Sequence, residues 1–232
     1  MGGLIVIMIF FGIVSYVVSN KLKSKFAKYS KISLQSGLSG KEIAEKMLKD
    51  HGIYDVKVTS VKGKLTDHYN PATKTVNLSE AVYHGRSAAS AAISAHECGH
   101  AVQHVTAYSM LELRSTLVPL QNISAKVINF IFMTMLFGAF FLPSIIPFQL
   151  ALPIIIGCYT IFTLFAFITL PVEFDASKRA LQWITDQRVV NSNEHAMAKD
   201  ALKWAAMTYV VVAVGSLVTL LFYVMMFLGG RD

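Results

Sequence analysis

Four long runs of apolar residues constrain this chain more than any other feature of its sequence. A helix of roughly 20 apolar residues crosses the hydrocarbon core of a bilayer, and the third and fourth runs approach or exceed that length. The second run is shorter. Apolar residues make up 54% of the chain, whereas a typical soluble domain has about 45–50%. The four runs are residues 4–19, 127–142, 150–170 and 205–228.

The first run is predicted to be a retained membrane anchor rather than a cleaved signal peptide. A signal peptide usually has basic residues before its apolar segment and a small-residue cleavage site after it. Here the basic residues follow the run, which places the N-terminus outside the cell. These basic residues are Lys21, Lys23, Lys25, Lys28 and Lys31.

The Lys and Arg residues are divided unevenly among the segments between the apolar runs. Of the 21, fifteen lie in residues 20–126 and five in residues 172–204, whereas residues 127–171 contain none. Four spans would put both basic segments on one side of the membrane, and the positive-inside rule makes that side cytoplasmic. The sequence thus predicts a multi-pass protein of the plasma membrane.

Three prolines interrupt the region between the second and third runs and predict a tight hairpin there. They are Pro143, Pro147 and Pro153. An alternative topology makes residues 127–170 a re-entrant pair that enters the membrane and returns to the same side. Both topologies leave the two basic segments on one face.

A small α+β region is predicted between the basic linker and residue 95. Ser39-x-x-Glu42 is a capping box that begins a helix, and Gly52 ends that helix. "DHYNPATKTVNLS", residues 67–79, predicts a strand, an Asn-Pro turn and a second strand. Further short strands are indicated by Val56, Val58, Val61 and Leu65, with Lys62-Gly63 as a turn.

The second strand of this hairpin, around residues 74–78, allows two interpretations. It could present a free edge on which an extended peptide is bound by β-augmentation. Alternatively, it is a plain hairpin strand. Ser87 is expected to cap the next helix, which runs through several alanines into the motif described below.

Residues 96–100 read His-Glu-Cys-Gly-His, the H-E-x-x-H pattern of hydrolytic zinc sites. Two histidines four residues apart stand on one face of a helix, so both imidazoles can reach the same ion. The intervening glutamate can take a proton from the zinc-bound water, whose pKa the metal lowers to about 7. The pattern predicts Zn²⁺, one ion per chain, with His96 and His100 as ligands and Glu97 as the general base.

The motif leaves the third protein ligand of a catalytic zinc site to be found elsewhere. His104 is nearest in sequence, but a rise of 1.5 Å per residue puts it about 12 Å from His96 along the helix axis. Ligand bonds of about 2 Å cannot span that distance, so His104 is expected to support a ligand or to lie at the surface. The extended metzincin pattern also fails, because Gln103 and Thr106 replace its glycine and histidine.

Two carboxylates, Glu173 and Asp175, lie in "PVEFDASKRA", where the third apolar run ends. "HECGHAVQH" with "EFDASKRA" far downstream, together with "DHYNPATKTVNLS", resembles the bacterial membrane neutral zinc metallopeptidases, the YugP-like family. The resemblance runs along nearly the whole chain. More distantly, the chain resembles the HtpX/Ste24-type membrane gluzincins, whose third zinc ligand is the glutamate of an E-F-x-A-D motif. That resemblance implies Glu173 as the third ligand.

This sequence departs from the gluzincin motif at its last position, where Ser177 replaces the aspartate. A hydroxyl can still hydrogen-bond a ligand, although more weakly than a carboxylate. Asp175 is the alternative third ligand. The oxyanion of the tetrahedral intermediate also needs a donor, and five residues are candidates for this role: His68, Tyr69, Tyr83, His104 and Arg179.

The expected fold class is a mainly α membrane protein with about four transmembrane helices and a small cytoplasmic α+β domain of zincin-like metalloprotease type. The expected function is zinc-dependent hydrolysis of membrane or unfolded polypeptides near the cytoplasmic surface. The polypeptide substrate and the lipid bilayer are the expected partners, and an oligomeric state or a regulatory partner is compatible with this function. The segments are a membrane anchor (1–20), a cytoplasmic region with the HExxH helix (21–126), a transmembrane hairpin (127–171), a cytoplasmic segment with the third ligand (172–204) and a transmembrane helix (205–232).

Three other functional classes fit the sequence less well. A non-catalytic zinc-binding scaffold or chaperone is the main alternative, but structural zinc sites usually have four protein ligands. A transporter is expected to carry ionisable residues within its spans, and the apolar runs contain none. Nucleic-acid binding is not expected, since the basic residues form no single stripe with aromatics. Cys98 and Cys158 are interpreted as small packing residues.

Overall fold

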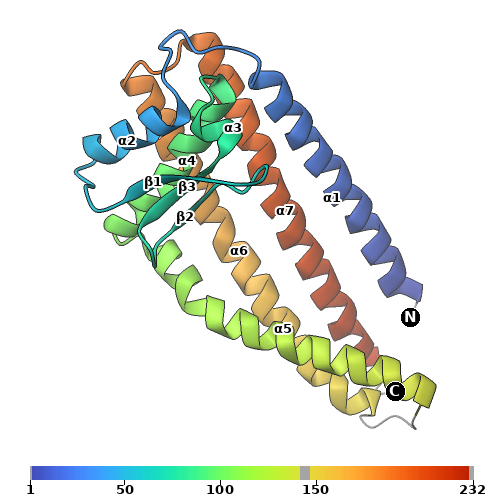
Figure 1. The fold of residues 1–232 in the computed structure, drawn as a ribbon. Coiled ribbons are helices and arrows are strands. Elements are labelled where there is room, and N and C mark those ends of the chain that lie inside the picture. The colour runs from blue at the N-terminus through green and yellow to red at the C-terminus, as the bar shows by residue number, and fades with distance from the viewer. Residues whose placement is uncertain (1, 142–146, 230–232) are drawn as a thin grey trace. The chain divides into compact units, whose positions relative to one another are not determined.

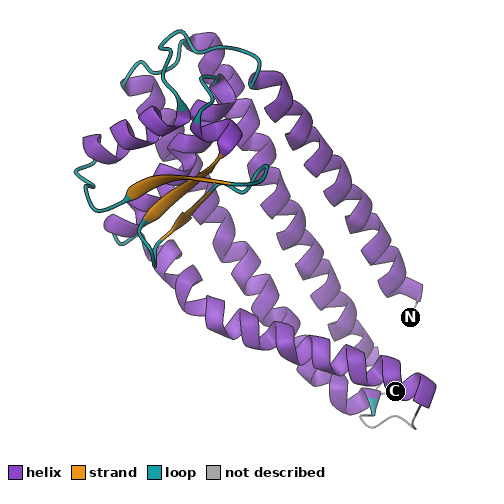
Figure 2. Ribbon diagram, in the orientation of Figure 1, coloured by secondary structure: helices purple, strands orange, loops and turns teal. Residues whose placement is uncertain are grey.

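The computed structural model describes residues 2–141 and 147–229, and the chain is mainly helical within them (Figure 1). One small sheet interrupts the helices (Figure 2). The turn predicted around Pro143 lies outside the described residues. The elements are α1 (Gly2–Tyr29), α2 (Gly40–Asp50), β1 (Lys57–Val61), β2 (His68–Asn70), β3 (Thr75–Ser79), α3 (Glu80–Tyr83), α4 (Ala88–Val105), α5 (Ser109–Phe141), α6 (Phe148–Asp186) and α7 (Ser192–Gly229).

Three helices in the described part of the chain are long and apolar enough to cross a membrane. They are α1, nearly all of α6, and α7. The apolar runs had predicted this membrane character. The second run, 127–142, falls almost entirely within α5, and a fourth span there stays a prediction. Helix α6 continues through Pro171, so the predicted segment 172–204 consists of two helix ends and a short connection.

The chain divides into two compact units, each assembled from segments that are distant in sequence. In the first, which we call the apolar unit, Ile131 of α5, Ile155 of α6 and Tyr223 of α7 are buried in one cluster. The second, which we call the α+β unit, contains the sheet and the HExxH helix. The apolar unit comprises Met1–Ser15, Leu113–Leu170 and Tyr209–Asp232, and the α+β unit comprises Tyr16–Glu112 and Pro171–Thr208.

The core of the α+β unit forms where α2 and β3 pack near the alanine-rich face of α4. Ile43 and Met47 of α2 and Leu78 of β3 are fully buried there. Alanine side chains project little from a helix, so they let neighbouring elements approach α4 closely. The buried alanines of α4 are Ala88, Ala89, Ala91, Ala92, Ala95 and Ala101.

The predicted starts of α2 and α4 are confirmed by their caps. The backbone N–H of Glu42 donates to Ser39 Oγ, and the backbone N–H of Ser39 donates to a Glu42 carboxylate oxygen, which completes the capping box. Gly52, with a φ of 70°, follows the end of α2. Ser87 caps α4 by accepting a hydrogen bond from the backbone N–H of Ser90. The HExxH motif therefore lies on a helix, as predicted.

The sheet has the strand order β1-β3-β2, with β1 parallel and β2 antiparallel to β3. The predicted hairpin of residues 67–79 is present as β2 and β3. The interpretation of residues 74–78 as a free edge is wrong, because β3 is the central strand and pairs on both sides. Leu65 was expected in a strand, but it lies between β1 and β2 with a φ of 57°.

Candidate metal centre

Helix α4 places the two histidines of the motif side by side. Their ring centroids are 4.8 Å apart, as expected for residues separated by about one helical turn. Both side chains are nearly buried, with exposed fractions of 11% for His96 and 12% for His100. Cys98, between them in sequence, points into the core instead and donates weakly to the carbonyl of Ala44. It is a packing residue, as the sequence suggested.

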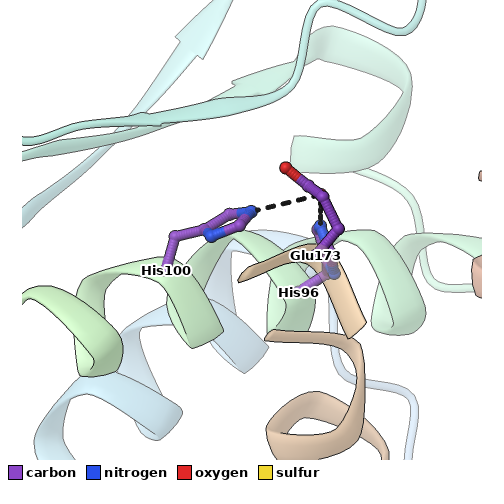
Figure 3. Close-up of side chains that lie close together, drawn as sticks. All are labelled: His96, His100 and Glu173. Atoms are coloured by element: carbon purple, nitrogen blue, oxygen red, sulfur yellow. Dashed lines mark ion pairs between the residues drawn. The ribbon is translucent and has the colours of Figure 1, made fainter. Parts of the chain in front are cut away.

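Helix α6 brings Glu173 to the two histidines, although it follows them by more than 70 residues in sequence. Figure 3 shows the three side chains converging. Oε2 of Glu173 lies 3.3 Å from Nε2 of His96 and 3.6 Å from Nε2 of His100. The Glu173 side chain is only 4% exposed. A metal ion could be held by a group of at least three histidine, cysteine or acidic side chains, and among the described residues these three form such a group.

The spacing of these donor atoms fits zinc. Bonds of about 2.0–2.2 Å to a tetrahedral ion separate the ligand atoms from one another by about 3.3–3.6 Å. The two distances to Glu173 lie in that range, and all three donor atoms lie within 4.8 Å of one another. Two imidazole nitrogens and one carboxylate oxygen are also a typical donor set of catalytic zinc. The residues present therefore suit the ion that the motif predicts.

Gly99 makes the close approach of α4 and α6 possible. A Cβ atom at this position would lie 2.7 Å from the carbonyl oxygen of Ala176 and 3.1 Å from its Cα. Real Cβ atoms do not approach backbone this closely. The second variable position of the HExxH motif is therefore a contact point between helices, and it sets how near Glu173 comes to the histidines.

The variant Gly99→Ala is expected to push α6 away from α4. Overpacking of this kind costs about 1–3 kcal/mol of stability, and it should also weaken zinc binding because α6 carries Glu173. Thermal unfolding and zinc titration of the purified variant would measure both effects. Gly157→Ala is a matched control on α6, since nothing lies within 4 Å of its added Cβ. Equal behaviour of the two variants would contradict this role of Gly99.

Each histidine also has a hydrogen-bond partner at its second ring nitrogen. Ser177 Oγ lies 3.2 Å from Nδ1 of His96, so the serine that replaces the gluzincin aspartate still contacts a predicted ligand. Gln103 Oε1 lies 3.0 Å from Nδ1 of His100. Such contacts fix the ring orientation and the tautomer of a metal-binding histidine.

Gln103 is fully buried, and its amide group has one orientation. Its Nε2 donates to the backbone carbonyl of Val172 and to Asp175, both at 2.8 Å. Because a carbonyl can only accept, the amide oxygen must face His100, and Nδ1 of His100 must carry the hydrogen. The lone pair of its Nε2 is then directed to the side where Glu173 lies. No motif predicts a role for Gln103, and only its spacing three residues after His100 indicates this contact.

Glu97 is buried next to the cluster and is held by the sheet. The backbone N–H of Tyr69, on the edge strand β2, donates to Glu97 Oε2 at 3.0 Å. Burial raises the pKa of Glu97, and the nearby imidazoles of His96 and His100 oppose this shift only in part. A carboxylate with a raised pKa accepts and returns a proton more readily near neutral pH. Sequence reasoning did not find the contact with Tyr69, because it joins residues 28 positions apart.

The other candidates from the sequence lie outside the three-residue cluster. His104 Nδ1 is 2.8 Å from the hydroxyl of Tyr69 and is exposed. Asp175, the alternative third ligand, is bound by Gln103 and by Arg179, whose Nε donates to it at 2.6 Å. His68 Nδ1 is 2.8 Å from the backbone carbonyl two residues before it and is also exposed. A role at the oxyanion stays a prediction for each of the five candidates, His68, Tyr69, Tyr83, His104 and Arg179.

Comparison with known proteins supports the assignment of this chain to a family of metallopeptidases. Residues 4–228 match the family described as "Putative neutral zinc metallopeptidase". The chain is 43% identical over 219 residues to "Putative membrane protease YugP" of Bacillus subtilis (strain 168), across 94% of this chain and 93% of that protein. No solved structure matches significantly. The resemblance to the YugP-like family is confirmed, and the more distant one to HtpX/Ste24-type gluzincins stays a prediction.

Proposed function

The chain belongs to this metallopeptidase family, and we propose that it is a membrane-integrated zinc-dependent endopeptidase that cleaves membrane or unfolded polypeptides near the cytoplasmic membrane surface. One observation carries the proposal. His96, His100 and Glu173 converge beside the buried carboxylate of Glu97. Three protein ligands leave one coordination position for water or substrate, which is the pattern of catalytic rather than structural zinc.

The residues of the cluster have distinct proposed roles. His96 and His100 would hold one Zn²⁺ per chain through their Nε2 atoms, and Glu173 through its carboxylate. When bound, zinc polarises a peptide carbonyl and lowers the pKa of water. Ser177 and Gln103 keep the two imidazole rings oriented by their contacts with Nδ1. These contacts reduce the reorganisation that metal binding requires.

Glu97 is the proposed general base. Its carboxylate accepts a proton from the attacking water and passes it to the nitrogen of the leaving amine. The hydrogen bond from the Tyr69 backbone restricts the orientation of the carboxylate. Burial raises the pKa of Glu97, which makes its carboxylate a stronger base toward the proton of the attacking water.

Charge and hydrophobicity support the proposed location. Glu173 follows the third apolar run by only three residues, and 20 of the 21 Lys and Arg residues fall in the two segments that contain the cluster. By the positive-inside rule, those segments are expected in the cytoplasm. The relative from Bacillus subtilis is described as a membrane protease, which agrees with a bilayer environment.

Removal of zinc is expected to abolish cleavage of an unfolded polypeptide such as casein by the purified protein. Treatment with a chelator followed by removal of the chelator should leave an inactive enzyme, because the water then lacks its activating ion. Addition of one equivalent of Zn²⁺ should restore the activity. Cleavage that persists at full rate without bound metal would contradict the proposal.

Cysteine labelling tests the orientation separately. In Lys62→Cys, the new thiol lies in the exposed connection between β1 and β2. It is expected to react with a membrane-impermeant maleimide only after the membrane is opened. Cys98 and Cys158 are both buried and give little background. Gly2→Cys is the reciprocal control, because the N-terminus is expected outside and its thiol should react in intact cells. Labelling of position 62 in intact cells would contradict the proposed orientation and indicate that the cluster faces outward.

The alternative function is a non-catalytic zinc-binding scaffold or chaperone in the membrane. It predicts the same metal content but no dependence of any activity on Glu97. Because a structural site does not need a buried base beside its ligands, the observed position of Glu97 favours the enzyme.

A further inference from the structure

A groove runs between α6 and α7 within the α+β unit. Its volume is about 640 Å³, and residues from both helices line it. None of His96, His100 and Glu173 lines this groove. Ser177 lines the groove and contacts Nδ1 of His96. Nε2 of the same imidazole faces Glu173.

The two ends of the groove differ in chemistry. One end is apolar and includes Phe174 and Met207. The next helical turn carries Lys178 and Lys203, and Lys199 lies one turn beyond Lys203. Lys178 follows Phe174 by four residues, and Lys203 precedes Met207 by four. Both lysines therefore stand about 6 Å further along their helices than the apolar residues. Because α6 and α7 are antiparallel, the two helices place their apolar residues at the same end of the groove and their ammonium groups one turn away from that end.

The apolar end belongs to the parts of the helices that border the membrane. Met207 lies inside the fourth apolar run, and Phe174 follows the third run by four residues. Phe174 is 49% exposed, although it is a large apolar side chain. Both α6 and α7 contain stretches apolar enough to cross a bilayer. The ammonium groups are then expected at the depth of lipid headgroups.

The basic end of the groove has an excess of positive charge. Three lysines and His195 face a single carboxylate, that of Asp186. Within the described residues, Lys178 and Lys199 form no ion pair with a carboxylate. Basic pockets between helices at the cytoplasmic surface are suited to anionic headgroups.

We propose that this groove binds an anionic phospholipid, with its phosphate at Lys178, Lys199 and Lys203 and its acyl chains along Phe174 and Met207. A phospholipid matches both ends of the groove at once. An extended peptide would lack backbone partners here, because helical backbone groups are already hydrogen-bonded within α6 and α7. The inference rests on the membrane placement of the helices and not on peptide hydrolysis, so the two can fail independently.

The test compares lipid binding by the purified full-length protein and two triple variants. Native mass spectrometry in detergent would measure binding of phosphatidylglycerol and of phosphatidylcholine. The first variant is Lys178→Gln, Lys199→Gln, Lys203→Gln. The control is Lys49→Gln, Lys62→Gln, Lys64→Gln, which removes the same charge from exposed positions elsewhere.

The wild type is expected to prefer phosphatidylglycerol. A lysine near an anionic headgroup contributes about fivefold to affinity, so the groove variant should lose about 100-fold and the control less than threefold. Equal losses in both variants, or no preference between the lipids, would overturn the proposal. Equally tight binding of glycerol phosphate without acyl chains would indicate an anion site instead. Competition by an acidic peptide at the same affinity would indicate a peptide groove.

Discussion

Glu97→Gln is expected to abolish peptide hydrolysis while leaving zinc bound. Loss of a general base lowers the rate by about 10²–10⁴-fold, and here the same side chain also returns the proton to the leaving amine. Glutamine has nearly the shape of glutamate, and its amide oxygen can still accept the hydrogen bond from Tyr69. The turnover number and the zinc content of the purified variant are the two measurements.

A matched control for this variant is Glu45→Gln, which removes an exposed carboxylate from α2. It should leave the turnover number within about twofold, because exposed ion pairs contribute little to stability. Unchanged cleavage by Glu97→Gln would exclude Glu97 as the base. Loss of zinc from Glu97→Gln would instead show that Glu97 contributes to metal binding.

Glu173→Ala is expected to reduce zinc affinity by at least about 100-fold, since removal of even a supporting contact near a metal costs about 10–100-fold. The substitution leaves two histidines on one helix, and two ligands hold zinc poorly. Activity at submicromolar zinc should fall with the metal content. Competition with a chromophoric chelator at fixed pH would measure the affinity directly.

Asp175→Asn distinguishes between the two carboxylates near the cluster. Asp175 accepts hydrogen bonds from Gln103 and Arg179, and an amide oxygen in its place can still accept. Its zinc affinity should therefore fall much less than that of Glu173→Ala. If Glu173→Ala keeps its zinc and Asp175→Asn loses it, the third ligand has been assigned to the wrong carboxylate.

Local features of the fold could be predicted from the sequence because their causes are local. The capping box of Ser39 and Glu42 forms as expected, since its residues are three apart. The same holds for the β2–β3 hairpin and for the cap of α4 by Ser87. His96 and His100 share a helical face for the same reason. Each prediction needed only the geometry of a few consecutive residues.

Long-range features of the site could not be derived from spacing. The parallel pairing of β1 with β3 makes β3 the central strand and leaves β1 and β2 as the edges, and this pairing makes the free-edge interpretation wrong. Gln103 and Gly99 had no assigned role, because their partners lie on α6, about 70 or more residues later. Glu173 was identified only through a family resemblance. Contacts between distant segments depend on tertiary packing, which cannot be predicted from the periodicity of apolar residues along the chain.

The most direct test of the central claim is cleavage of a defined unfolded polypeptide in water enriched in ¹⁸O by the purified, zinc-loaded protein. Hydrolysis predicts new carboxyl termini that carry ¹⁸O, detected by mass spectrometry, and none with Glu97→Gln. Full zinc occupancy with no new carboxyl termini would contradict the claim and favour a zinc-binding scaffold.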